Sequence, residues 1–257
     1  MMAERVWDRF LTEADKTHLA TGGRDRRVGF GNKPALLLID LYRAVYGDRR
    51  EPLLEAIKEW PSSCGPMAWD SLPHIQRLLA ASREAGIPVI HITMLANAGM
   101  PGWHEAAHRD DAPRSQPTDA GALDRQRRSP EIIDELAPIP GEVVLRKASP
   151  SAFWGTPLVG QLNYLGVDTI IVAGESTSGC VRASVVEGCT YRFRMQVVEE
   201  CVFDRHEAPH ALNLFDMHQK YADVISLGKA VDYIASKSTR GQAPTDLEAR
   251  QHVPALV

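Results

Sequence analysis

The chain has 257 residues, of which 44% are hydrophobic and 24% are charged, a balance typical of a globular protein. Its formal net charge of −4 at pH 7 gives no indication of a nucleic-acid or anionic-membrane partner. No apolar run is long enough to span a bilayer, and residues 1–27 lack the apolar core of a secretory signal, so we expect a cytoplasmic protein. The four cysteines have no CxxC spacing and no partnered histidines, so we expect reduced thiols and no zinc.

Residues 1–32 are expected to form an N-terminal arm ahead of a single domain that covers residues 33–235. The arm contains apolar side chains that could dock on a neighbouring surface: Trp7, Phe10 and Leu11. Residues 236–257 show only weak periodicity, and we expect a C-terminal tail that swaps onto a partner subunit or frays.

The domain alternates apolar runs typical of buried strands with segments of helical spacing. In chain order we expect strand 34–40, helix 71–85, strand 88–92, strand 142–145, helix 157–165, strand 169–173, helix 180–189, strand 196–198, helix 206–221, strand 224–225 and helix 229–234. Residues 97–128 are rich in Gly, Pro and charge, and they are predicted to form a long functional loop. The alternation indicates βαβ units and a three-layer α/β/α fold around an open, mainly parallel sheet of about six strands.

Three reactive side chains follow predicted strands. Asp40 closes the first strand, Lys147 follows the strand at 142–145, and Cys180 follows the strand that ends at Ala173. Ligands of open parallel sheets bind beyond the carboxyl ends of the strands, so these groups are expected to converge. Taken singly, the aspartate could be a turn residue, the lysine a surface residue and the cysteine an inert core residue.

Cys180 is predicted to begin a helix after the small-residue loop 174–179. The helix dipole and the free amides there would make its thiol easier to ionise, and the thiolate is the nucleophile. Asp40 could then act as general base, and Lys147 could hold the carboxylate in place. The remaining cysteines, Cys64, Cys189 and Cys201, are interpreted as inert.

Four segments of this sequence carry a family resemblance: 34–40, 144–158, 170–184 and 202–224. With them the chain resembles the isochorismatase-like cysteine hydrolases, and within these the group around N-carbamoylsarcosine amidase. The resemblance implies a catalytic triad of Asp40, Lys147 and Cys180. It also implies a non-proline cis peptide before Thr177 and an oxyanion hole made by the amides of Thr177 and Cys180.

The resemblance also suggests substrate-binding residues. Arg205 matches an arginine that binds a substrate carboxylate in this group, although a salt bridge to Asp204 or another acid is an equal alternative. Ser176 and Trp154 are further candidates, and the aromatic residues Phe153, Trp154 and Trp103 line either a pocket or the core. Glu175 would oppose an anionic substrate unless it is paired. Arg182 is expected to meet an acid or a subunit contact.

The same resemblance separates branches of the family. Isochorismatases lack the nucleophilic cysteine, so Cys180 argues against that branch. Nicotinamidases bind a metal through histidines, but residues 41–46 contain none, so we expect no catalytic metal. His91 and His104 lack ligand spacing. No glycine-rich phosphate motif follows a strand, so no cofactor is expected.

These features predict a hydrolase that acts on carbon–nitrogen bonds of linear amides. We expect cleavage of a terminal C–N bond in a small carboxylate bearing an N-carbamoyl or amide group, through a thioester and with release of ammonia. N-carbamoylsarcosine, maleamate and ureidoacrylate belong to this class, and biuret is a neutral alternative. A non-catalytic scaffold member of the family is the other hypothesis. We expect a homo-oligomer, with a tetramer favoured.

Overall fold

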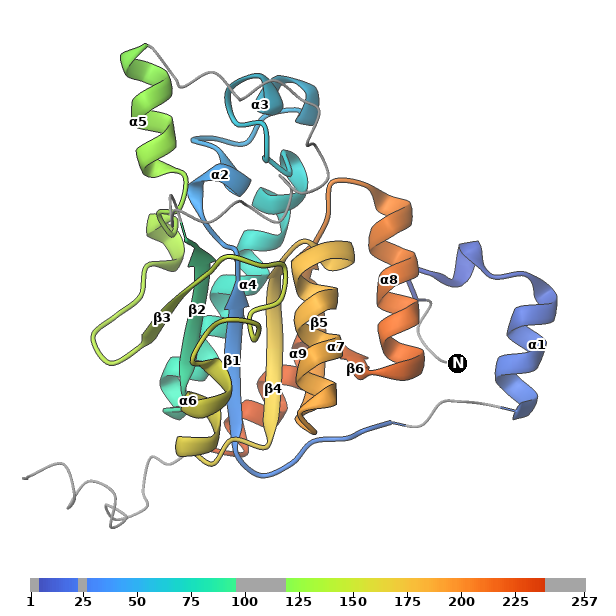
Figure 1. Ribbon diagram of the computed structural model, residues 1–257. Helices are drawn as coiled ribbons and strands as arrows, with labels where there is room; N and C mark the ends of the chain where they lie inside the picture. Colours follow the sequence, from blue (N-terminus) through green and yellow to red (C-terminus); the bar gives the residue numbers. More distant parts are fainter. Residues whose placement is uncertain (1–4, 23–26, 96–118, 239–257) are drawn as a thin grey trace, which may run out of the picture.

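The computed structural model of the protein describes residues 5–22, 27–95 and 119–238. Its centre is a six-stranded sheet with the order β3-β2-β1-β4-β5-β6, in which every neighbouring pair is parallel (Figure 1). The strands are β1 (Pro34–Ile39), β2 (Val89–Met94), β3 (Val143–Lys147), β4 (Thr169–Glu175), β5 (Arg194–Phe203) and β6 (Ala222–Ile225). The expected fold class is therefore confirmed.

The two central strands are apolar because helices cover both of their faces. All six residues of β1 are buried, and so are all seven of β4. Leu36 and Leu38 pack into one hydrophobic core, whereas Leu37 and Ile39 pack into the other. This alternation explains why a continuous apolar run, and not a half-polar one, forms the middle of the sheet.

The helices lie in two layers. Helices α4 (Pro66–Ala85) and α9 (Leu227–Ala235) cover one face. The other face carries α6 (Leu158–Tyr164), α7 (Arg182–Thr190) and α8 (Glu207–Lys220), as Figure 1 shows. Within the described residues, no helix is both long enough and apolar enough to cross a membrane.

A third group of short helices stands beyond the carboxyl ends of the strands (Figure 1). It comprises α2 (Arg43–Tyr46), α3 (Leu53–Glu59) and α5 (Ala120–Arg128). Helix α5 occupies part of the predicted loop 97–128, whereas residues 96–118, with Trp103 and His104, lie outside the described residues. The side chain of Asp119 caps α5 by accepting a hydrogen bond from the amide of Ala122. Such a capping residue marks the start of a helix, but the charged and Gly- and Pro-rich composition of the segment favoured a loop.

The described part of the N-terminal arm includes a short 3-10 helix, η1 (Asp8–Phe10), and α1 (Glu13–Gly22), which stands away from the body beyond α8 (Figure 1). Trp7 is buried against α8, where its ring lies 6.0 Å from Phe215 and 5.5 Å from His218. The apolar arm residue thus docks on its own chain. The proposed boundaries at 32/33 and 235/236 stay predictions.

Candidate active site

The carboxyl ends of three strands bring an acid, an amine and a thiol together. Lys147 Nζ lies 2.9 Å from an Asp40 carboxylate oxygen and 3.3 Å from Cys180 Sγ. Asp40 and Lys147 are buried, and Cys180 is partly buried. The negative charge of Asp40 also acts on the Cys180 thiol and raises its pKa, after the larger effect of burial. Three residues that the sequence placed at separate strand ends therefore form one contiguous cluster.

The backbone at the end of β1 turns sharply to aim the carboxylate. Asp40 has a φ of 57°, and its amide donates to the carbonyl of Ile92 on the neighbouring strand. Aspartate tolerates this left-handed conformation better than most residues do. Beside it, Gly174 of β4 has a φ of +127°, and a Cβ there would lie 2.0 Å from the carbonyl oxygen of Ile39. Only glycine lets the two strand ends approach so closely.

Cys180 does not begin a regular α-helix, which corrects the start, though not the existence, of the helix predicted over 180–189. It lies in a single π-type turn, η4 (Thr177–Val181), and α7 begins two residues later at Arg182. Gly179 in this turn has the non-helical angles φ −112° and ψ −105°, and a Cβ on it would meet the Ser176 hydroxyl at 2.5 Å. The small residues that precede the cysteine thus shape a tight turn ahead of the helix.

The expected ease of ionisation of the thiol is not supported. Burial, and next the negative charge of Asp40, raise the pKa of Cys180, and the ammonium of Lys147 opposes them without prevailing. Burial also raises the pKa of the Asp40 carboxyl. Burial acts to lower the pKa of Lys147, but its two partners outweigh burial and the net direction is upward. These directions favour the protonated form of the Cys180 thiol and the charged form of Lys147.

Two residues that sequence reasoning missed fix the loop that carries the cysteine. Asp204 accepts from the amide and the hydroxyl of Ser178 at 2.8 and 2.7 Å. The hydroxyl of Thr177 lies 2.8 Å from Nδ1 of His210 on α8. The position of Asp204 at the end of β5 was a signal for the first contact, but nothing in the sequence singled out His210. The Ser176 carbonyl completes the turn by accepting from two later amides.

The cis peptide bond lies one residue earlier than the resemblance implied. It joins Glu175 to Ser176, not Ser176 to Thr177. Strand β4 stays paired with β5 as far as the partners Glu175 and Phe203. The chain leaves the sheet directly after that pair.

Arg205 is paired with an acid, as one of the two sequence interpretations held. Its Nη1 lies 2.7 Å from the Glu175 carboxylate, and its Nη2 donates to the carbonyl of Ser62. Asp204 is not its side-chain partner, because the carboxylate of Asp204 accepts instead from the Arg205 amide. Glu175 is buried, whereas 30% of the arginine side chain is exposed. Arg182 likewise pairs with an acid, Asp216, at 3.1 Å.

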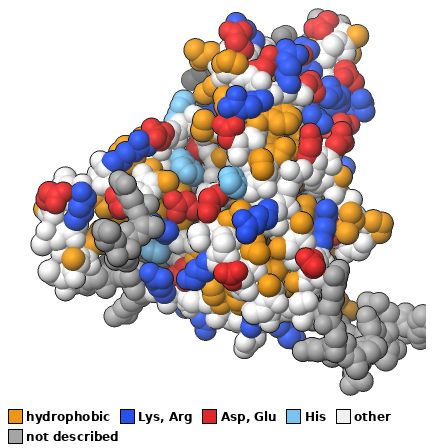
Figure 2. Space-filling model, turned by 180° about the vertical axis from the view of Figure 1, so that it is seen from behind, with side chains coloured by type: hydrophobic (Ala, Val, Ile, Leu, Met, Phe, Trp, Pro, Cys, Tyr) orange, Lys and Arg blue, Asp and Glu red, His pale blue; other side chains and the backbone are white. Residues whose placement is uncertain are grey.

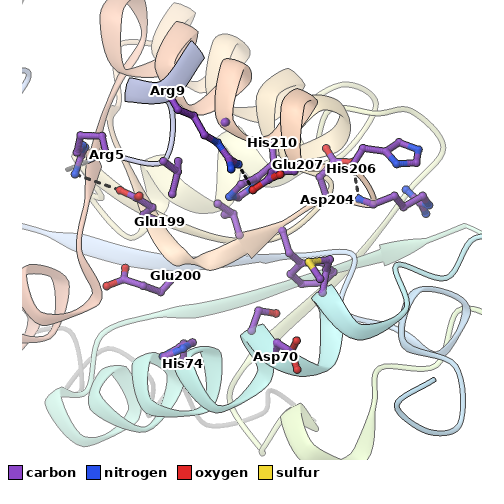
Figure 3. Close-up of a pocket in the computed structure, with 17 residues that line it drawn as sticks. Arg5, Arg9, Asp70, His74, Glu199, Glu200, Asp204, His206, Glu207 and His210 are labelled. Carbon is purple, nitrogen blue, oxygen red and sulfur yellow. Dashed lines mark hydrogen bonds and ion pairs between the residues drawn. The ribbon is translucent and has the colours of Figure 1, made fainter. Parts of the chain in front are cut away.

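Two hollows border the residues around the cluster, although Cys180 lines neither. One, of about 970 Å³, lies between α4 and the segment of η1 and α8, and Arg205 and Asp204 are among its lining residues (Figure 3). Histidine and acidic side chains gather on this side of the molecule (Figure 2). The other hollow, of about 830 Å³, is lined by Trp154, Ser178 and Gly179 among others.

The aromatic candidates divide between surface and core. Trp154 is 62% exposed and borders the second hollow. Phe153 is buried and stacks on Tyr191 and Phe193, so it is a core residue. Of the remaining cysteines, Cys64 and Cys201 are buried, and burial raises the pKa of both thiols.

The described histidines are not arranged as metal ligands. His91 lies within β2, where its Nε2 is 2.9 Å from the Glu142 carboxylate. Across residues 5–22, 27–95 and 119–238, no group of three His, Cys, Asp or Glu side chains could hold a metal ion.

Comparison with known proteins agrees with this fold. Residues 34–228 match the model of the Isochorismatase domain. Maleamate amidohydrolase of Pseudomonas putida is 37% identical over 216 residues, which cover 81% of this chain and 90% of the relative. N-carbamoylsarcosine amidase of an Arthrobacter species is 33% identical over 220 residues, which cover 82% of this chain and 75% of the relative.

Solved structures share the architecture at lower identity. A cysteine hydrolase from Pseudomonas syringae has a TM-score of 0.65 at 18% identity, and the match covers 82% of this chain and 97% of that one. N-carbamoylsarcosine amidase from Thermoplasma acidophilum has a TM-score of 0.55 at 23% identity, with 76% and 96% covered. Because the family model spans most of the chain and the first two relatives exceed 30% identity, the protein belongs to the isochorismatase family.

Proposed function

We propose that this protein is a cysteine amidohydrolase that cleaves a terminal C–N bond of a small amide or ureido compound. The observation that carries the proposal is the position of Lys147 Nζ, 2.9 Å from Asp40 and 3.3 Å from Cys180 Sγ. A nucleophile, a base and a group that orients the base are the parts that amide hydrolysis through a covalent intermediate requires. Relatives named maleamate amidohydrolase and N-carbamoylsarcosine amidase support the same reaction class.

In the first half of the proposed reaction, Asp40 takes the proton of the Cys180 thiol as sulfur attacks the carbonyl carbon. This coupling suits a thiol whose pKa is raised by burial, because the proton leaves only when the S–C bond forms. Lys147 holds the carboxylate in position, and its ammonium, 3.3 Å from the sulfur, stabilises the negative charge that develops there as the proton leaves. The C–N bond then breaks as Asp40 returns the proton to nitrogen, so that ammonia leaves and a thioester remains.

In the second half, Asp40 takes a proton from water, and the hydroxide oxygen attacks the thioester. The C–S bond breaks, and the proton on Asp40 returns to sulfur, which regenerates the thiol. The product is an acid, or a carbamate that can lose CO₂. The amides of Thr177 and Cys180 are the proposed oxyanion donors. They are distinct from the amides of Ser178, Gly179 and Val181, which already donate within the protein.

We further propose a substrate that carries a carboxylate, with Arg205 as its anchor and with Ser176 and Trp154 as further contacts, although Arg205 and Trp154 line different hollows. Support comes from the partial exposure of Arg205 and from the names of relatives that act on maleamate and N-carbamoylsarcosine. Biuret is the second candidate, and the pairing of Arg205 with Glu175 favours such a neutral compound. The two candidates are separated by measuring the affinity of an Arg205→Ala variant for each of them. Only the substrate that carries a carboxylate should bind more weakly to this variant.

The nucleophile is tested with Cys180→Ala and Cys180→Ser. Both variants should lose roughly 10³-fold or more of the ammonia release from a panel of small amides, because no covalent intermediate can form efficiently. Cys189→Ala is the matched control, since this thiol lies on α7 against the apolar core. Full activity of Cys180→Ala would remove the nucleophile from the mechanism. Wild-type protein without ammonia release from any compound would favour the scaffold hypothesis.

A homo-oligomer, with a tetramer favoured, and a cytoplasmic location are proposed as well. The protruding helix α1 supports association between copies (Figure 1). Light scattering tests this state against 28.4 kDa for one chain.

A further inference from the structure

The pairing of Arg205 leaves the proposed substrate anchor without a net charge. Glu175 precedes the loop of Cys180 directly, and its carboxylate contacts the arginine at 2.7 Å. The second terminal nitrogen of the guanidinium donates to the carbonyl of Ser62. A substrate carboxylate that approaches this arginine therefore meets a neutral pair and not a free cation.

The surroundings of Glu175 do not supply a replacement for that charge. Besides Arg205, the groups that face it are the thiol of Cys64 at 3.6 Å, the carboxylates of Asp40 and Asp204, and the side chains of Tyr42 and Cys180. The ammonium of Lys147 is already committed to Asp40. Another anion at Arg205 would lie near several carboxyl groups, and like charges repel one another.

We infer that Glu175 is a specificity-determining residue that sets the charge of the accepted substrate. As a carboxylate it neutralises Arg205 and weakens binding of amides that carry a carboxylate, whereas with a proton it leaves the arginine free to bind them. Binding of an anionic amide is then linked to uptake of a proton by Glu175. This inference rests on the proposed amidohydrolase function, and it deepens it by naming the residue that selects between anionic and neutral amides.

The pH at which the preference changes follows from the environment of the carboxyl group. Burial raises the pKa of Glu175 to about 7, against the opposing effect of Arg205. A group of that pKa is mostly protonated at pH 6 and mostly ionised at pH 8. An anionic amide should therefore bind about tenfold more tightly at pH 6 than at pH 8.

The test measures binding by calorimetry in a Cys180→Ala background, in which the ligand is not consumed. The probes are maleamate, which carries a carboxylate, and maleamide, a neutral diamide of nearly the same size. With Glu175 intact, only maleamate should lose about tenfold of its affinity between pH 6 and pH 8. With Glu175→Gln added, maleamate should bind at pH 8 as tightly as at pH 6, and maleamide should not change.

Glu142→Gln in the same background is the matched control. Glu142 is likewise a carboxylate paired with an arginine, Arg83, at 2.8 Å, but it is only partly buried and directly precedes β3 at the opposite edge of the sheet. It should leave both affinities unchanged. The inference would be overturned if maleamate bound with equal affinity with and without Glu175. It would also be overturned if maleamide gained as much affinity as maleamate in Glu175→Gln, or if no variant bound maleamate. The proposed function is tested separately, by ammonia release that is present in the wild-type protein and lost when Cys180 is replaced. The proposed function can therefore hold even when the inference about Glu175 fails.

Discussion

At the scale of single residues, the site is organised by three ionisable groups in a small volume. Burial disfavours the charged forms of both Asp40 and Lys147, and their contact at 2.9 Å opposes this effect: it prevails at Lys147, whose pKa is raised, but not at Asp40, whose pKa also lies above its ordinary value. The thiol is uncharged while it keeps its proton, so burial does not destabilise it as it destabilises a charged group. Its reactivity in the proposed mechanism therefore depends on transfer to Asp40 during attack, and not on a thiolate that exists beforehand.

This arrangement predicts opposite effects of Asp40→Asn on turnover and on thiol acidity. Ammonia release should fall by roughly 10²–10⁴-fold because the general base is lost. The pKa of Cys180 should fall, since Asp40 raises it and Lys147 remains to stabilise the thiolate. The pH dependence of iodoacetamide labelling of the Cys180 peptide, read by mass spectrometry, measures the second effect. Asp216→Asn, at the Arg182 pair, is the control, and an unchanged labelling midpoint in Asp40→Asn would contradict the arrangement.

At the scale of elements, the strands were predicted more successfully than the helices beyond the sheet. The runs at β1 and β4 are apolar on both faces, and no other environment suits such sequences. Helix α5 was missed because a highly charged exposed helix has no apolar stripe to detect. Cys180 was predicted to begin a helix but lies in the turn η4, because the hydrogen bonds of Ser178 to Asp204 that shape this turn come from a distant strand end.

The junction of β1 and β4 predicts a large effect of Gly174→Ala. A Cβ there would overlap the carbonyl oxygen of Ile39, and the φ of +127° is unfavourable for alanine. The free energy of unfolding should fall by about 3–5 kcal/mol, measured by urea denaturation. Gly160→Ala in α6 is the matched control, because open space surrounds that position and alanine should stabilise the helix by up to about 1 kcal/mol. A loss below about 1 kcal/mol in Gly174→Ala would contradict the close approach of the strands.

At the scale of the whole molecule, the parallel sheet gathers distant parts of the chain at one edge. Its strand order places β1 beside both β2 and β4, so residues separated by more than a hundred positions share one site. The same packing buries Glu175 under the helices beyond the sheet. A buried carboxyl group whose pKa is raised makes the stability of the whole protein depend on pH.

The sign of that dependence is fixed by the upward shift. Below the ordinary pKa of 4.5, Glu175 is protonated in both the folded and the unfolded chain, and its stabilising contribution is complete. Between 4.5 and about 7 only the folded chain keeps the proton, so the contribution is lost as the pH rises. Relative to Glu175→Gln, the wild type should lose about 2 kcal/mol of unfolding free energy between pH 5 and pH 8. Urea denaturation of both proteins at the two pH values measures this difference, and a constant difference would show that Glu175 is ionised throughout.

The sequence by itself determined the alternation of strands and helices, the parallel sheet and the strand ends that carry Asp40, Lys147 and Cys180. Hydrophobic periodicity and chain order are local properties, and they suffice for these features. Only the tertiary structure decided that the pKa of the thiol is raised, that His210 and Asp204 hold its loop, and that Glu175 pairs with Arg205. Burial and contacts between distant segments set these properties, because the electrostatic energy of a charge depends on everything packed around it and not on its neighbours in the chain.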